Sequence, residues 1–83
     1  EVKWCILETG ERHDTWSVGS AGSAITIVLS GVHEFSIAPD GENGKAITRR
    51  LTAGMAIFWE NSVPHKWRVI KRAGTITIRR LSR

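Results

Sequence analysis

Residues 51–67 read LTAGMAIFWENSVPHKW, and this stretch decides the fold. Its Met55 to Trp59 segment is the longest uninterrupted apolar run of the chain and has the length of one β-strand. Gly54 in front of the run permits a sharp turn, because glycine adopts backbone angles that other residues avoid. Pro64 fixes the backbone just before His65. The stretch therefore predicts a strand, a turn and a second strand that starts at His65.

A period of two runs through most of the chain. β-Branched and aromatic residues fill short segments between turn formers, which is typical of antiparallel strands. We expect about eight strands, over Val2 to Leu7, Arg12 to Val18, Ala24 to Ser30, Val32 to Ile37, Ala46 to Leu51, Met55 to Trp59, His65 to Ile70 and Thr75 to Leu81. Loops are expected at Gly19 to Ser23 and Pro39 to Gly44, with a turn or bulge at Gly31. No window has the spacing of an amphipathic helix, so the sequence predicts an all-β jelly roll, small antiparallel barrel or sandwich.

A single domain over residues 1–83 is expected, because a chain of 83 residues can surround only one hydrophobic core. No apolar run approaches the roughly 18 residues of a membrane span, so we expect no membrane association. Cys5 alone cannot close a disulfide within the chain, and no secretory leader is visible, which together indicate the reducing cytoplasm. The sequence leaves open a further N-terminal segment before Glu1.

The stretch quoted above resembles the second motif of the cupin family, G-x5-P-x-G-x2-H-x3-N. Gly54 and His65 have the separation of the motif's first glycine and its histidine, and Pro64 is also common in the family. The departures from the motif are Glu60, Ser62 and Val69. Small single-domain bacterial cupins without assigned function end in a similar Pro-His-x-Trp and Thr-x-Arg pattern, here residues 64–67 and 77–79. The resemblance implies a cupin-like domain.

The first cupin motif, G-x5-H-x-H-x3-4-E-x6-G, can be laid on Gly10 to Gly31 when its middle gap is taken as five residues. Trp16 and Val18 then stand at the two histidine positions and Ala24 at the glutamate position. A metal in a protein usually needs three or four nitrogen or oxygen ligands, and this alignment keeps only His65. We therefore expect no metal cofactor, and leave open a weakly held divalent ion at His65.

The same positions predict a ligand pocket. Strand alternation places His65 and Trp67 on one face, and the motif directs Trp16, Val18 and Ala24 towards the same interior. An aromatic cavity with one polar group suits a small organic ligand, so we expect these five residues to bind one. A purely structural His65, hydrogen-bonded at its turn, fits the sequence equally well.

Two other functions remain open. A metal-dependent dioxygenase or isomerase would use His65 and needs His13 or His33 to turn inward, although both are expected at the surface or partly buried. A nucleic-acid or acidic-partner module would use the basic end of the chain, where no acid follows Glu60. The basic residues there are Lys66, Arg68, Lys71, Arg72, Arg79, Arg80 and Arg83. They include no known recognition motif, so nucleic acid is the less favoured partner.

Both faces of the strand expected over Ala24 to Ser30 are apolar. Ile25, Ile27 and Leu29 occupy one face, and smaller residues occupy the other. Because a thin domain can bury only one face of this strand internally, we expect a homodimer that covers the other.

Overall fold

The computed structural model of the chain describes residues 1–18 and 22–81, and its regular structure is entirely antiparallel β-strand. One sheet contains the six strands β1 (Val2–Leu7), β2 (Arg12–Ser17), β3 (Gly22–Ile37), β4 (Ile47–Leu51), β5 (Ala56–Glu60) and β6 (His65–Leu81). The all-β prediction is confirmed. The expected number of strands is wrong, because residues 24–30 and 32–37 form one long strand, and so do residues 65–70 and 75–81.

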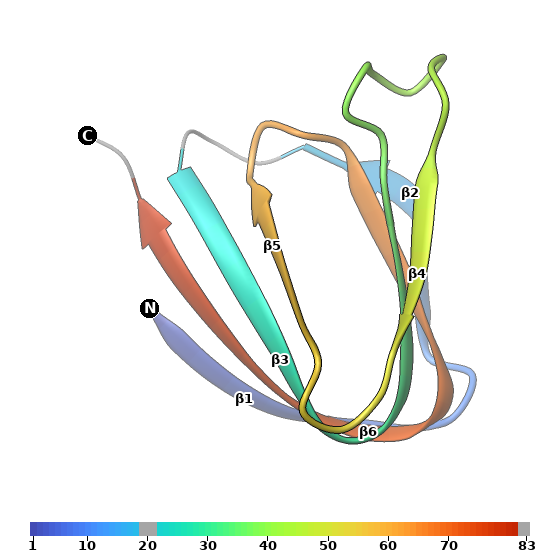
Figure 1. Cartoon of the computed structure of the whole chain (residues 1–83), viewed down its shortest axis with the longest axis vertical. Helices are drawn as coiled ribbons and strands as arrows, with labels where there is room; N and C mark the ends of the chain where they lie inside the picture. Colours follow the sequence, from blue (N-terminus) through green and yellow to red (C-terminus); the bar gives the residue numbers. More distant parts are fainter. Residues whose placement is uncertain (19–21, 82–83) are drawn as a thin grey trace.

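The sheet is folded over so that its two halves face each other (Figure 1), and the strand pairings give each half four strands. β3 and β6 pair along their whole lengths and run through both halves. The first half-sheet has the order β1-β6-β3-β5 and uses residues 73–78 of β6 and 23–27 of β3 for its outer pairings. The second half-sheet has the order β2-β6-β3-β4 and uses residues 65–68 of β6 and 33–37 of β3. Within the described residues the sheet does not close into a barrel, so the fold is a jelly-roll-like sandwich.

Gly31 lies at the bend between the two half-sheets. Its φ is +77°, and the pairing of β3 with β6 shifts register between Val28 and His33. A Cβ built on Gly31 would lie 1.9 Å from the carbonyl oxygen of Arg72, so only glycine allows the two strands to approach here. The predicted bulge at Gly31 is confirmed, but the strand continues through it instead of ending.

The bulge also decides which residues of β3 face the core. Before it, Ala24 and Val28 are buried, and after it the buried apolar position is Phe35. The inward-facing residues of β3 are thus even-numbered before the bulge and odd-numbered after it, because one extra residue reverses the alternation of a strand. Leu51 and Trp59 complete the core cluster between the half-sheets.

The connections agree with the expected loops where the structure describes them. Residues 39–44 form turns, in which the Gly41 amide donates to the Ala38 carbonyl and the Gly44 amide to the Gly41 carbonyl. The predicted loop at Gly19 to Ser23 falls partly outside the described residues, and its last two residues begin β3. No helix long and apolar enough to cross a lipid bilayer occurs in residues 1–18 or 22–81.

Candidate functional site

A cavity of about 180 Å³ lies between the two half-sheets. The first half-sheet contributes side chains from β1, β3, β5 and β6, and the second contributes side chains from β3 and β6. The lining consists of Lys3, Cys5, Leu7, Thr26, His33, Phe35, Trp59, His65, Trp67, Thr75, Thr77 and Arg79. The predicted site residues His65 and Trp67 are both among them.

Five of these side chains form a continuous set of rings, which we call the aromatic cluster: His33, Phe35, Trp59, His65 and Trp67. His65 stacks on Phe35 with ring centroids 6.0 Å apart, and lies 5.4 Å from Trp59. On the other side, His33 stacks on Trp67 at 5.5 Å. The cavity therefore has one wall made of π faces, to which a flat ligand can pack.

His65 begins β6, directly after the turn that Pro64 fixes, as the sequence predicts. Its Nδ1 lies 3.0 Å from the backbone carbonyl of Val63. Because a carbonyl can only accept a hydrogen bond, Nδ1 carries the proton and donates it. Nε2 is then the nitrogen left for a ligand, an acceptor in the neutral ring and a donor in the protonated ring. The structural and the ligand-binding interpretations of His65 are thus compatible.

His33 is a cavity residue that the sequence interpretation placed at the surface or partly buried, and this expectation is wrong. Its side chain is only 3% exposed, and Nδ1 is buried without a hydrogen-bond partner. Burial lowers the pKa of His33 from its ordinary value of 6.5, since the charged ring is poorly solvated there. The signal that could have found it is the alternation after Gly31, which places His33 on the same face as Phe35.

The first half-sheet supplies the two cationic side chains of the cavity, Lys3 and Arg79. Ala24 of β3 pairs with Arg79 of β6 on one side and with Trp59 of β5 on the other. The side chains of Arg79 and Trp59 therefore lie on the same inner face, with the small side chain of Ala24 between them. In the next row, Lys3 pairs with Thr77, whose hydroxyl lies 2.8 Å from that of Thr26. None of the described residues that line the cavity is Asp or Glu. Sequence reasoning missed Lys3, Trp59 and Arg79 as site residues, because it did not predict the pairing of these strands.

Trp16 and Val18 are not part of the cavity lining, and the structure corrects their expected inward orientation. From His13 to Ser17, β2 advances four residues while β6 advances only two, so the register of the pairing shifts within the segment that contains Trp16. The Trp16 ring lies under Lys66 Nζ, 4.5 Å from the ring centroid. Lys66 alternates with His65 and Trp67 along β6 and therefore faces outward. Val18 is 60% exposed. Ala24, by contrast, is buried in the core beside the cavity.

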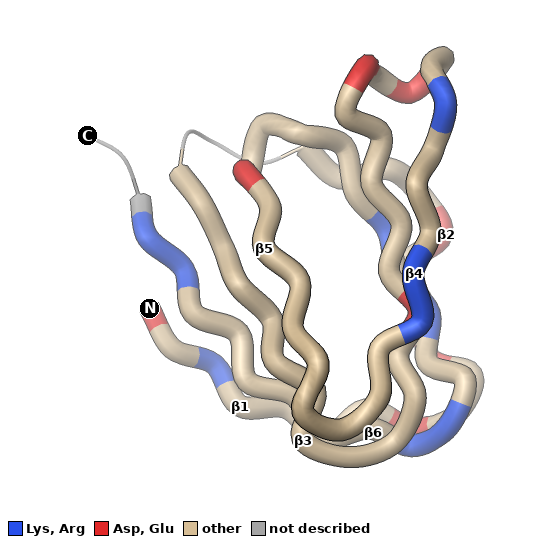
Figure 2. Tube along the Cα trace, viewed as in Figure 1, with Lys and Arg blue, Asp and Glu red and all other residues tan. Residues whose placement is uncertain are grey.

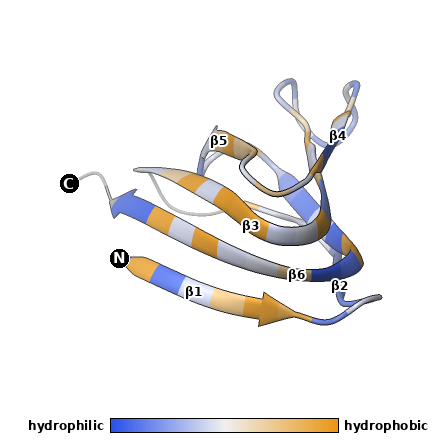
Figure 3. Cartoon of the chain, turned by 60° about the horizontal axis from the view of Figure 1, so that its bottom comes forward, coloured by the Kyte–Doolittle hydropathy of each residue, from blue (hydrophilic) through white to orange (hydrophobic). Residues whose placement is uncertain are grey.

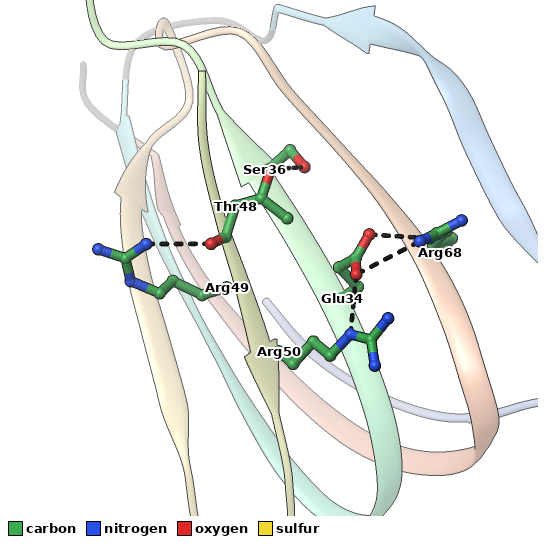
Figure 4. A network of polar contacts seen from close by, with 6 residues as sticks. All are labelled: Glu34, Ser36, Thr48, Arg49, Arg50 and Arg68. Carbon is green, nitrogen blue, oxygen red and sulfur yellow. Dashed lines mark hydrogen bonds and ion pairs between the residues drawn. The ribbon is translucent and has the colours of Figure 1, made fainter. Parts of the chain in front are cut away.

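The outer face of the second half-sheet carries an ion-pair network. Glu34 accepts hydrogen bonds from Arg68 Nε at 2.8 Å and from Arg50 Nε at 3.1 Å (Figure 4). The hydrogen bond from Arg68, followed by that from Arg50, lowers the pKa of Glu34 against the opposing effect of its burial. On the same side a polar cleft of about 230 Å³ contains His13, which is exposed and hydrogen-bonded to Ser17.

The basic residues of β6 do not form the single basic face that the sequence suggests. They are spread along the strand (Figure 2): Lys66 and Arg68 lie near the start of β6, Lys71 and Arg72 at its bend, and Arg79 and Arg80 at its C-terminal end. Arg68 is paired with Glu34, Arg72 with Glu8 and Arg79 with Glu1. Arg83 lies outside the described residues. Among the described residues, no group of three or more His, Cys, Asp or Glu side chains is close enough together to hold a metal ion.

No family model matches the sequence, and no curated protein matches it. Solved structures of similar fold do exist. The CENP-C cupin domain of Drosophila melanogaster superposes with a TM-score of 0.80 over 95% of this chain and 59% of its own, at 14% identity. A conserved protein of unknown function from Streptococcus pyogenes gives 0.79 over 99% and 64%, at 21% identity. Hydroxypropylphosphonic acid epoxidase from S. wedmorenis gives 0.72 over 92% and 40%, at 24% identity.

These likenesses show that the chain has the cupin fold, which confirms the fold expected from its motifs. The chain spans about three fifths of the length of the first two of these solved chains. The same fold occurs in the CENP-C cupin domain and in an epoxidase, so the fold alone does not determine an activity.

Proposed function

We propose that the chain binds a small aromatic carboxylate in the cavity between its two half-sheets. The observation that carries the proposal is the composition of the lining: the aromatic cluster of five rings, the two cations Lys3 and Arg79, and no acidic group among the described residues that line it. An anion with a flat apolar body is complementary to both the rings and the cations.

The size and the shape of the cavity suit one substituted ring. An apolar protein cavity of roughly 150 Å³ accommodates benzene, and this one measures about 180 Å³. Phe35 and Trp59, with centroids 4.7 Å apart, offer faces on which a flat ring packs. His65 Nε2 adds one polar contact that can orient a substituent.

Arg79 and Lys3 are the groups that would hold the carboxylate. Ala24 lies between Arg79 and Trp59, and its side chain is only a methyl group. This leaves room for the ligand's carboxylate beside the guanidinium of Arg79 while the ligand's ring lies against the indole of Trp59. Arg79 has one weak competing contact, 3.9 Å to the carboxylate of Glu1. A charge-assisted hydrogen bond to an arginine contributes about 1.5–3 kcal/mol.

Unpartnered polar groups around the cavity add to the case. Trp59 Nε1 is buried without a hydrogen-bond partner, as is His33 Nδ1. Leaving a buried donor unpaired costs about 1–3 kcal/mol. A ligand oxygen, with a small adjustment of the indole, would offset this cost at Trp59.

The proposal is tested by titrating benzoate and its uncharged isostere benzamide into the protein, followed by isothermal calorimetry. We expect benzoate to bind with a Kd below about 1 mM, a modest free energy for nine non-hydrogen atoms. Benzamide should bind about ten times more weakly. The variants Arg79→Gln and Lys3→Gln should each lose about tenfold for benzoate. Lys66→Gln, which removes an equal charge outside the cavity, should bind normally. Equal affinity for benzoate and benzamide would overturn the anionic part of the proposal.

The alternative functions have less support. The basic residues that a nucleic-acid module would use lie on several faces, and Arg68 and Arg72 among them are ion-paired. Cys5 is half-buried in the lining of the same cavity, where an inert reduced thiol suits a cytoplasmic protein. We propose the cytoplasm as its location on that ground.

A further inference from the structure

The outer face of the first half-sheet is apolar, although it points away from the core. We call it the outer apolar face; its residues are Val2, Trp4, Ile6, Ile25, Ile27, Leu29, Phe58, Ile76 and Ile78. Apolar bands lie next to one another on β1, β6 and β3 (Figure 3). Val2 and Trp4 are each 70% exposed and Phe58 is 63% exposed. A soluble monomer rarely leaves so many large apolar side chains together in water, so this face calls for a partner.

Strand register arranges these side chains in rows across the four strands. One row contains Val2, Ile78, Ile25 and Phe58, and the next contains Trp4, Ile76, Ile27 and Ala56. A third row, at the end of the face, is charged. In this row Ser23 of β3 pairs with Arg80 of β6 on one side and with Glu60 of β5 on the other. Neighbouring strands are about 4.8 Å apart, so Arg80 and Glu60 stand roughly 10 Å apart with β3 midway between them.

We propose that the outer apolar face binds a second copy of this chain, related by a two-fold axis that runs along β3. Such an axis places β6 of one subunit opposite β5 of the other, because these two strands flank β3 on its two sides. Arg80 then opposes Glu60 of the partner subunit, and Glu60 opposes Arg80 of the partner subunit. The charged row is thus complementary to itself, which is the requirement of an isologous interface.

The apolar residues of the three central strands fit the same axis. Ile25 and Ile27 lie on it and meet their own counterparts, while Ile78 meets Phe58 of the partner subunit. β1 is two strands away from β3, so it lies past the edge of the partner sheet, beside β5 of the partner. The strands of the two subunits remain closely aligned, as they are in most pairs of stacked sheets, which pack about 10 Å apart. The opposite charges lie at equal distances on the two sides of β3, so this face is complementary to itself. A second copy of the chain is therefore the partner that this face favours. The cavity lies on the other side of the sheet, and the inference is independent of the proposed ligand.

The test is the molar mass in solution, measured by sedimentation equilibrium between about 1 and 200 μM, because the dimer fraction depends on concentration. We expect a dimer in the upper part of this range. Phe58→Lys should give a monomer, and Val18→Lys, which changes a similarly exposed apolar side chain outside the face, should not. Thermal unfolding of both variants separates a lost interface from a lost fold. A monomer throughout the range, or equal effects of both variants on folded protein, would overturn the proposal.

The charged row provides a sharper test of the axis. Glu60→Arg and Arg80→Glu each replace two attractive contacts per dimer by two repulsive ones, so each should weaken dimerisation by about tenfold or more. An equimolar mixture of the two variants should regain the wild-type affinity as a heterodimer, because every opposed pair is again Arg with Glu. An interaction within one chain would not be restored by mixing. Failure of the mixture to dimerise would rule out this axis.

Discussion

Phe35 and Trp59 belong to opposite half-sheets, and their ring centroids are 4.7 Å apart in the middle of the core. The exposed fractions of their side chains are 3% and 5%. Phe35 is on β3 after the bend and Trp59 is on β5, so this contact joins the two layers of the sandwich. It also forms the centre of the aromatic cluster, and the stability of the fold and the shape of the cavity therefore depend on the same two rings.

Phe35→Ala should lower the free energy of unfolding by about 3 kcal/mol or more, because it removes a buried ring and leaves a cavity that the rigid sheets cannot close. Val18→Ala, which truncates an exposed side chain, should change it by less than about 0.5 kcal/mol. Urea unfolding followed by tryptophan fluorescence measures both. Similar midpoints for the two variants would mean that Phe35 does not tie the half-sheets together.

Much of the fold could be predicted from the sequence, because each strand has its own alternation and turn formers. The Gly31 bulge was also predictable. Its consequence was not: a bulge looks the same in the sequence whether a strand ends there or bends and continues, and only the approach of Arg72 to Gly31 distinguishes the two. The expected strand after Val32 is therefore the second half of β3, and the sheet is folded in two.

Gly31→Ala should be far more destabilising than Gly10→Ala. Both glycines have positive φ, +77° and +88°, so both substitutions incur the strain of a left-handed backbone, about 1–2 kcal/mol. Only at Gly31 does the new Cβ collide with backbone, since nothing lies within 4 Å of a Cβ on Gly10. We expect a total loss above about 3 kcal/mol for Gly31→Ala, measured as the shift of the urea midpoint. Equal losses would contradict the close approach of β3 and β6.

The protein should become less stable as the pH falls below His33's ordinary pKa of 6.5. Burial lowers the pKa of His33 in the folded state, so just below 6.5 the unfolded chain binds more protons than the folded chain, and acidification favours unfolding. Glu34 adds a loss of the same sign only below its own ordinary pKa of 4.5. Between about pH 7.5 and 5.5, His33→Phe should reduce the fall of the urea midpoint, and His13→Gln should preserve it. An unchanged slope in His33→Phe would refute the assignment.

Protein purified without chelator should contain well below one transition-metal ion per chain. His33 and His65 line the cavity, but no third metal-binding side chain of the described residues is close enough to complete a site, and one or two imidazoles hold a divalent ion weakly. Elemental analysis for zinc, iron, manganese and nickel measures this directly. A content near one ion per chain that is lost in His65→Ala and kept in His13→Ala would favour the metal-dependent alternative.

The candidate site was only partly predictable, for a reason that concerns pairing. His65 and Trp67 were found because they follow the turn at Pro64 and alternate within one strand. Lys3, Trp59 and Arg79 come from other strands, and only the register of the sheet brings them to the same inner face. Trp16 was wrongly expected to face the cavity. The reason is the register shift in β2, which no glycine or proline between His13 and Ser17 indicates in the sequence.

The most direct test of the proposed ligand uses the four tryptophans of the chain. Trp59 and Trp67 line the cavity, whereas Trp4 and Trp16 lie outside it, so the four indole N–H signals in a ¹⁵N–¹H correlation spectrum report the site and its controls in one sample. On titration with benzoate, we expect the Trp59 and Trp67 signals to shift and saturate while those of Trp4 and Trp16 stay in place. Unmoved signals for Trp59 and Trp67 at saturating benzoate, or equal shifts for all four, would contradict a carboxylate site between the half-sheets.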